Sequence, residues 1–97
     1  MEISKEVILD YLQTHKSEFE KKFLITKIGL FGSFVRDEFT QDSDIDLLIK
    51  MKQKDFDKRF DFKLYLENVF GRKVDVGYED SIRSFIKKEI EKEIIYV

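Results

Sequence analysis

The chain has 97 residues, of which 39% are charged, and its formal net charge is -2. This length suits one small domain with a thin core, so we expect residues 1–97 to form a single domain. The balanced charge argues against a basic nucleic-acid-binding surface, and the absence of cysteine excludes disulfides and thiolate metal sites. We find neither an apolar signal region nor an apolar run that would span a bilayer, and we therefore expect a cytoplasmic protein without nucleic-acid or membrane partners.

Apolar residues at helical spacing predict a first helix over residues 4–22, with a break near residues 14–15. The next run, residues 25–31, is apolar and rich in β-formers, which predicts a buried strand. Residues 33–38 suggest one or two helical turns, and residues 39–43 suggest a polar loop. The first part of the chain is therefore expected to form a helix, a strand, a short helix and a loop.

A second strand is predicted for residues 44–51 and a third for residues 72–77. Between them, residues 54–70 are expected to form a helix that Gly71 closes in the left-handed conformation. We expect the apolar side chains of this helix to lie mostly inward: Phe56, Phe60, Leu64, Leu66, Val69 and Phe70. Asp80 is expected to cap a last helix.

The order of these elements predicts an α/β (α+β) fold, in which helices pack on a small mixed β-sheet. The chain closes with an apolar segment, residues 94–97. This segment is expected either to be buried in the chain's own core or to form part of an interface with another molecule.

Gly32 and Ser33 follow the first predicted strand. Glycine lets the backbone approach a ligand closely, free N–H groups at the start of a helix favour an anion, and a serine hydroxyl adds a donor. The pair is therefore a candidate phosphate-binding turn. The alternative is a tight strand-to-helix turn in which Ser33 is only a cap.

Asp44 and Asp46 are two residues apart in the second predicted strand, so their side chains are expected on the same face. Their Cα atoms would then lie about 6.6 Å apart. Carboxylates at such positions can converge on two metal ions about 3.5–4 Å apart. The alternative is a solvated strand end with no metal.

Asp75 lies between Val74 and Val76 in the third predicted strand. An acidic residue in a strand that must pack requires an explanation, because β-propensity disfavours it. A neighbouring strand would bring it beside Asp44 and Asp46, and three such carboxylates would raise one another's pKa unless a cation compensates. The alternative is an exposed edge-strand residue that pairs with a lysine.

Two motifs at a fixed spacing resemble the signature of the minimal nucleotidyltransferases of the polymerase-β-like superfamily. They are residues 32–36 (Gly-Ser-Phe-Val-Arg) and residues 43–47 (Ser-Asp-Ile-Asp-Leu). Residues 71–76 resemble the strand of that family that carries a third carboxylate, and residues 89–97 resemble its usual ending. The resemblance therefore covers most of the chain and implies the nucleotidyltransferase fold.

The resemblance also implies roles for individual residues. Three carboxylates would hold two magnesium ions and act in catalysis: Asp44, Asp46 and Asp75. Gly32 and Ser33 would bind the phosphates of ATP, the nucleotide substrate. Arg36 would either neutralise phosphate charge or pair with Asp37, Glu38 or Asp42. Two positions depart from the family pattern, because Val35 and Asp37 stand where alanine and glycine are common, and Asp37 adds a negative charge near the phosphate site.

The function implied by the resemblance is transfer of AMP from ATP to a hydroxyl of a partner protein. In the resembling family the usual partner is a HEPN-domain ribonuclease toxin that is modified on tyrosine, and the nucleotidyltransferase is its antitoxin. Two alternatives stay open: a non-catalytic nucleotide-binding antitoxin that neutralises its partner by occlusion, and transfer to a small molecule. A homo- or hetero-oligomer is compatible with each of them.

Overall fold

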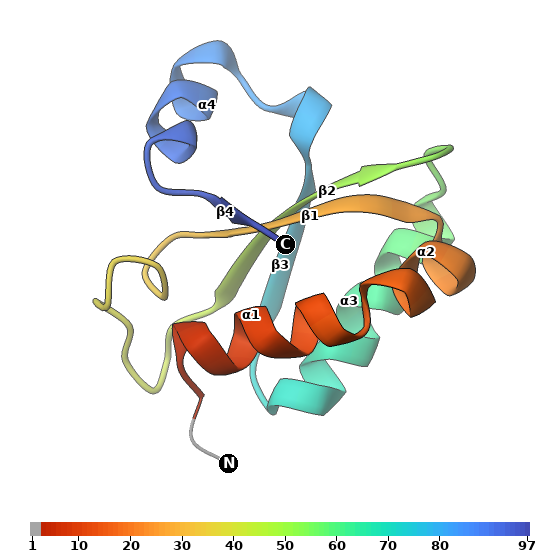
Figure 1. The fold of residues 1–97 in the computed structure, drawn as a ribbon. Helices are drawn as coiled ribbons and strands as arrows, with labels where there is room; N and C mark the ends of the chain where they lie inside the picture. Colours follow the sequence, from red (N-terminus) through yellow and green to blue (C-terminus); the bar gives the residue numbers. More distant parts are fainter. Residues whose placement is uncertain (1–2) are drawn as a thin grey trace.

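The computed structural model describes residues 3–97 and contains a four-stranded β-sheet with helices packed on one of its faces (Figure 1). Two helices precede the sheet: α1 spans Lys5–Thr14 and α2 spans Lys16–Phe23. The predicted break near residues 14–15 is confirmed, because His15 leaves the helical conformation between them. No helix within the described range is long and apolar enough to cross a membrane.

The sheet is mixed, as the sequence predicts. Its strands are β1 (Ile25–Phe31), β2 (Ile45–Met51), β3 (Val74–Tyr78) and β4 (Ile95–Tyr96). Their spatial order is β3-β2-β1-β4. Strand β1 is antiparallel to both β2 and β4, whereas β2 and β3 are parallel. The apolar chain end is therefore an edge strand of the sheet, and the backbone N–H of Val97 donates a hydrogen bond to the carbonyl of Ile28 at 3.0 Å.

The two faces of the sheet differ in composition. Alternate side chains of β1, β2 and β3 pack against α1, α2 and α3 (Phe56–Phe70). The sheet contributes these residues to the core: Ile25, Ile28, Leu30, Ile45, Leu47, Ile49, Met51, Val74 and Val76. Because successive residues of a strand point to opposite faces, Asp46 and Asp75 lie on the face away from these helices. The alternation expected for β2 is confirmed, and it puts the acidic residues outside the core.

Helix α3 (Phe56–Phe70) begins after Asp55, which caps it by accepting a hydrogen bond from the Lys58 backbone N–H, and it ends at Gly71 with φ 68°. The expectation that its apolar side chains lie mostly inward is wrong for three of them, since Phe56, Phe60 and Leu64 are 66%, 46% and 45% exposed. The helix carries two apolar rows at a spacing of four residues. The row that packs on the sheet consists of Phe62, Leu66 and Phe70.

Two local expectations near the ends of strands are also wrong. Residues 33–38 form a series of turns rather than helical turns. Asp80 does not cap the last helix, because a 3-10 turn, η1 (Glu79–Ser81), intervenes and α4 (Ser84–Glu91) begins only after Arg83. Asp80 instead pairs with Lys54 at 2.9 Å. Helix α4 buries none of its residues and lies apart from the three core helices (Figure 1).

Candidate functional site

The candidate site lies where β1 ends and β2 and β3 begin. In the register of the sheet, Phe31 at the end of β1 is opposite Asp46 in β2, and Asp46 is opposite Asp75 in β3. The structure therefore brings Asp46 and Asp75 together, as the sequence predicts. Asp75 is exposed on an edge strand, and Asp46 is half-buried between its two neighbours.

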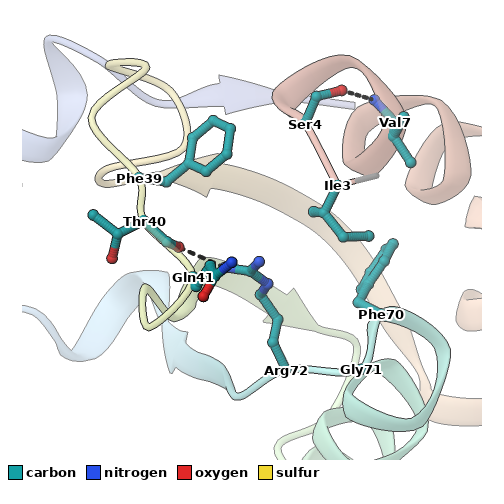
Figure 2. A pocket seen from close by; sticks show the side chains of 9 residues that line it. All are labelled: Ile3, Ser4, Val7, Phe39, Thr40, Gln41, Phe70, Gly71 and Arg72. Atoms are coloured by element: carbon teal, nitrogen blue, oxygen red, sulfur yellow. Dashed lines mark hydrogen bonds between the residues drawn. The ribbon is translucent and has the colours of Figure 1, made fainter. Parts of the chain in front are cut away.

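Asp44 is placed by the loop before β2 rather than by the strand, which starts one residue later at Ile45. The Ile45 backbone N–H donates to the carbonyl of Lys73 at 2.9 Å, which fixes the start of β2 against β3. Arg72 Nη1 donates to the carbonyl of Thr40 at 3.1 Å (Figure 2). It also donates to the carbonyl of Ser43 at 2.9 Å and so holds the loop.

Arg72 was not predicted as a site residue. Its guanidinium carbon lies 5.0 Å from the centre of the Phe34 ring, and that ring stacks on Phe39 at 4.3 Å. Phe34 is fully buried and belongs to the hydrophobic core. The only sequence signal for Arg72 was its position directly after Gly71, which puts it at the same end of the sheet as Asp44.

Cavities border the site on two sides. One of about 810 Å³ lies between the start of α1, the loop at residues 39–41 and the end of α3, and none of the predicted site residues lines it (Figure 2). Another of about 390 Å³ lies between the turn after β1 and α4, and Gly32 and Arg36 are among its lining residues. The second cavity therefore adjoins the predicted phosphate turn.

The turn after β1 requires glycine at its first position. Gly32 is buried with φ 85°, and a Cβ at this position would overlap Oδ2 of Asp46. The carbonyl of Gly32 accepts hydrogen bonds from the backbone N–H groups of Val35 and Arg36 at 3.1 and 3.3 Å. This turn brings the backbone directly against the carboxylate in β2, which is the close approach that the Gly32-Ser33 motif predicts.

Asp37 completes the turn in the left-handed conformation with φ 57°. Aspartate tolerates this conformation better than most residues, and glycine adopts it without strain. The structure thus gives a physical reason why glycine is common at this position in the family that the sequence resembles. The Asp37 side chain is exposed.

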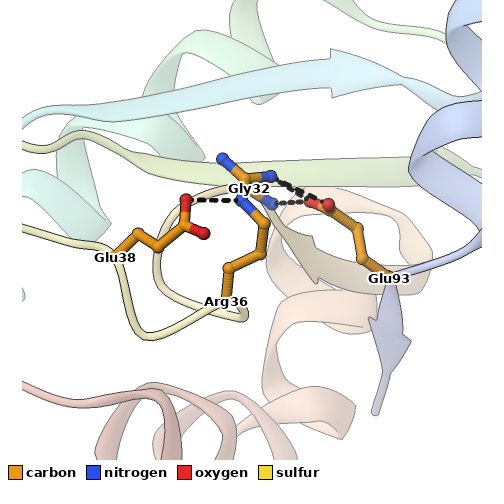
Figure 3. Close-up of polar contacts among 4 residues, drawn as sticks. All are labelled: Gly32, Arg36, Glu38 and Glu93. Carbon is orange, nitrogen blue, oxygen red and sulfur yellow. Dashed lines mark hydrogen bonds and ion pairs between the residues drawn. The ribbon is translucent and has the colours of Figure 1, made fainter.

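Arg36 binds two carboxylates. Its Nε donates to Glu38 at 3.1 Å, and its Nη1 donates to both oxygens of Glu93 at 2.8 and 3.0 Å (Figure 3). These hydrogen bonds raise the pKa of Arg36 above its usual value. Oε2 of Glu93 also accepts a hydrogen bond from the Gly32 backbone N–H. Pairing of Arg36 with a nearby acid was one of the two roles expected for it, but Glu93 was not predicted.

Negative charge accumulates around Asp46. Burial, followed by the charges of Asp75 and Asp44, raises the pKa of Asp46 to about 6, and Arg36 opposes this only in part. The charge repulsion expected from the sequence is therefore present at Asp46.

The carboxylates of Asp44, Asp46 and Asp75 are chemically suited to bind a divalent cation. Carboxylate oxygens are the ligands that magnesium prefers, and a cation beside Asp46 would relieve the repulsion that raises its pKa. Across residues 3–97, however, no three acidic or histidine side chains are already positioned to enclose a metal ion. The candidate ligands are thus neighbours that would have to reorient around magnesium.

Comparison with known sequences agrees with this chemistry. Residues 12–97 match the family described as the Nucleotidyltransferase domain. The protein MJ0128 of Methanocaldococcus jannaschii is 39% identical over 92 residues, which cover 93% of this chain and 94% of the relative. Protein adenylyltransferase MntA of Thermococcus cleftensis is 35% identical over 96 residues, which cover 98% of this chain and 97% of the relative.

Solved structures share the fold. A minimal nucleotidyltransferase matches with a TM-score of 0.79 at 24% identity, over 96% of this chain and 95% of that chain. A toxin–antitoxin structure with AMP-PNP matches with a TM-score of 0.70 at 17% identity, over 87% of this chain and 70% of that chain. A structure of the toxin–antitoxin MntA-HpeT matches with a TM-score of 0.66 at 20% identity, over 99% of this chain and 72% of that chain.

On this small mixed sheet, the glycine turn lies against the paired carboxylates Asp46 and Asp75. Together with the family match, this arrangement places the chain in the class of nucleotidyltransferases. The chain belongs to the nucleotidyltransferase domain family, and its fold is the one seen in a minimal nucleotidyltransferase.

Proposed function

We propose that this nucleotidyltransferase is magnesium-dependent and transfers AMP from ATP to a tyrosine hydroxyl of a HEPN-type ribonuclease toxin, acting as its antitoxin in the cytoplasm. The observation that carries the proposal is the row of Gly32, Asp46 and Asp75, in which a phosphate-binding turn meets two carboxylates. Two similarities support the proposal: one relative is the protein adenylyltransferase MntA, and similar folds occur in toxin–antitoxin structures.

In this proposal the residues of the turn bind the triphosphate. The Gly32 N–H and the Arg36 guanidinium donate hydrogen bonds to the same anionic group, which in this structure is the Glu93 carboxylate. A phosphate oxygen suits the same donors, because charge-assisted hydrogen bonds from N–H and guanidinium groups favour it. The Ser33 hydroxyl adds a further donor beside Gly32.

The carboxylates carry the chemistry. Asp44, Asp46 and Asp75 would hold two magnesium ions. When bound, magnesium supplies positive charge that polarises the α-phosphate and offsets the charge of the pyrophosphate leaving group. Asp75 is exposed on the edge strand β3, where a hydroxyl of a partner protein can approach it. We assign to it the positioning of that hydroxyl.

The acceptor is proposed to belong to a separate molecule. The match to MntA covers 97% of that relative, and residues 1–97 are proposed to act as one domain. A partner that docks at the exposed edge of the sheet would bring its own acceptor to Asp75 and form a hetero-oligomer with this chain.

The test is the intact mass of the protein encoded beside this gene after incubation with this chain and magnesium-ATP. We expect a gain of one or more AMP units with the wild-type chain and with Asp61→Asn, which removes an exposed charge of α3 far from the turn in sequence. Asp44→Asn combined with Asp46→Asn should abolish the gain. No gain despite a stable complex would contradict the transfer reaction, and no complex would contradict the partner and leave a small-molecule acceptor.

A second candidate function is neutralisation by occlusion without transfer. The observation in its favour is that Glu93 already fills the anion position at Gly32, while the carboxylates do not yet enclose a cation in the described part of the chain. Toxin neutralisation that survives in the Asp44→Asn/Asp46→Asn variant would favour this candidate over catalysis.

A further inference from the structure

We infer that Glu93 is an internal competitor of the nucleotide, whose carboxylate holds the phosphate-binding groups of Gly32 and Arg36 and must leave before a triphosphate can bind. The inference rests on the proposed nucleotide-binding function. It adds a residue that controls the affinity and that lies 61 positions along the chain from Gly32.

The contacts of Glu93 imitate those of a bound phosphate. One oxygen accepts from the Gly32 backbone N–H, and both accept from Nη1 of Arg36 at 2.8 and 3.0 Å (Figure 3). The Glu93 side chain is only 20% exposed, so water competes little for these hydrogen bonds. A carboxylate in this position offers two anionic oxygens to the same donors that a phosphate would use.

Glu93 and a phosphate cannot share the site. Gly32 offers a single backbone N–H, and Glu93 occupies it. If the Glu93 carboxylate stayed beside an entering phosphate, the two like charges would repel each other strongly in this partly desolvated turn. Two neighbouring residues increase this repulsion. Asp46 adds a further acidic group, and Glu38 already accepts the hydrogen bond from Nε of Arg36.

The position of Glu93 allows it to leave without unfolding the sheet. It lies in the turn between α4 and β4, and its backbone N–H donates to the carbonyl of Ile90 at 3.0 Å. The following residues are fixed by the pairing of β4 with β1. Rotation of the Glu93 side chain therefore opens the anion position while β4 keeps its place, and the adjoining cavity of about 390 Å³ provides room.

Glu93→Gln tests the inference, because it keeps the size of the side chain and an acceptor oxygen but removes the charge. We expect calorimetry to give a Kd for magnesium-ATP that is lower by roughly tenfold in Glu93→Gln than in the wild-type chain. The matched control is Glu91→Gln, which removes the same charge from the exposed last residue of α4 and should change the Kd by less than about twofold.

The Gly32 amide resonance provides a second measurement that does not depend on the variant. In the nucleotide-free chain its proton should lie downfield because of the hydrogen bond to a charged acceptor, and it should move when magnesium-ATP saturates the site. A Glu93→Gln variant that binds ATP equally or more weakly would overturn the inference, as would a Gly32 resonance that does not move. If the wild-type chain binds no ATP at all, the nucleotide-binding function itself fails.

Discussion

The raised pKa of Asp46 links the electrostatics of the site to the stability of the fold. Its pKa is about 6 in the folded chain, against an ordinary value of 3.8, because of burial and the charges of Asp75 and Asp44. Between these two pH values the folded state binds more protons than the unfolded state. The stabilisation from this proton is complete below the ordinary pKa and is lost as the pH rises through the folded value.

Without magnesium, the free energy of unfolding should depend on the protonation of Asp46. We expect the contribution of Asp46 to this free energy to fall by roughly 1–2 kcal/mol between pH 4 and pH 7, after allowance for the solvent screening of a half-buried carboxyl. Asp46→Asn should remove this fall, because the amide does not titrate. Urea unfolding at several pH values measures the effect. Asp61→Asn, on the exposed face of α3, should keep the wild-type dependence. Equal pH dependence in Asp46→Asn and the wild-type chain would contradict the assignment.

The central motif residues could be predicted because their chemistry is local. The positive φ at position 32 and its close contact with Asp46 both require glycine. A glycine at the end of a predicted strand can be recognised in the sequence. The long-range contacts of Gly32 and Ser43 could not be predicted in the same way. Glu93 reaches Gly32 across 61 positions and Arg72 reaches Ser43 across 29, and no periodicity encodes such contacts.

The helices and strands show a similar division between what local patterns decide and what packing decides. Strands β1, β2 and β3 and the glycine end of α3 were predictable, because β-formers and a left-handed glycine are local signals. The two-residue strand β4 was not predicted. The buried face of α3 was not, because its apolar residues form two rows and only the sheet selects between them. The row with Phe62 packs on the core, and the row with Phe60 stays exposed.

Strand β4 depends on a close approach at Gly29. This residue is opposite Tyr96, and a Cβ added to it would lie 2.6 Å from Cδ1 of Ile94 and 2.8 Å from Cε1 of Tyr96. Both distances are well below van der Waals contact, so a side chain here must displace the side chains of Ile94 and Tyr96.

We therefore predict that Gly29→Ala lowers the free energy of unfolding by about 1–3 kcal/mol through overpacking. The matched variant is Gly77→Ala in β3, where the added Cβ would meet only the flexible end of Leu48 at 3.3 Å. That variant should lose less than about 1 kcal/mol. Chemical denaturation of the two variants side by side provides the measurement. If they lost equal stability, the pairing of β4 would not depend on the space at Gly29.

Across the whole molecule, the candidate site joins segments that only the folded chain brings together. The Gly32 turn follows β1, Asp46 and Asp75 come from adjacent strands, and Glu93 comes from the turn before β4. An unfolded chain has no such arrangement, so a ligand of the site should bind the native state alone. Binding of this kind stabilises the fold in proportion to the logarithm of the ligand concentration above its Kd.

Magnesium-ATP should therefore raise the melting temperature of the wild-type chain. At a concentration one hundred times the Kd the stabilisation is about 2.7 kcal/mol, which corresponds to a shift of roughly 10 °C or more for a domain of this size. Calorimetric scans measure the shift. The Asp44→Asn/Asp46→Asn variant should lose most of it, and magnesium alone should give less, because only ATP contacts the Gly32 turn. An equal shift in the variant would place the nucleotide elsewhere on the chain, and the row of Gly32, Asp46 and Asp75 would then not be its site.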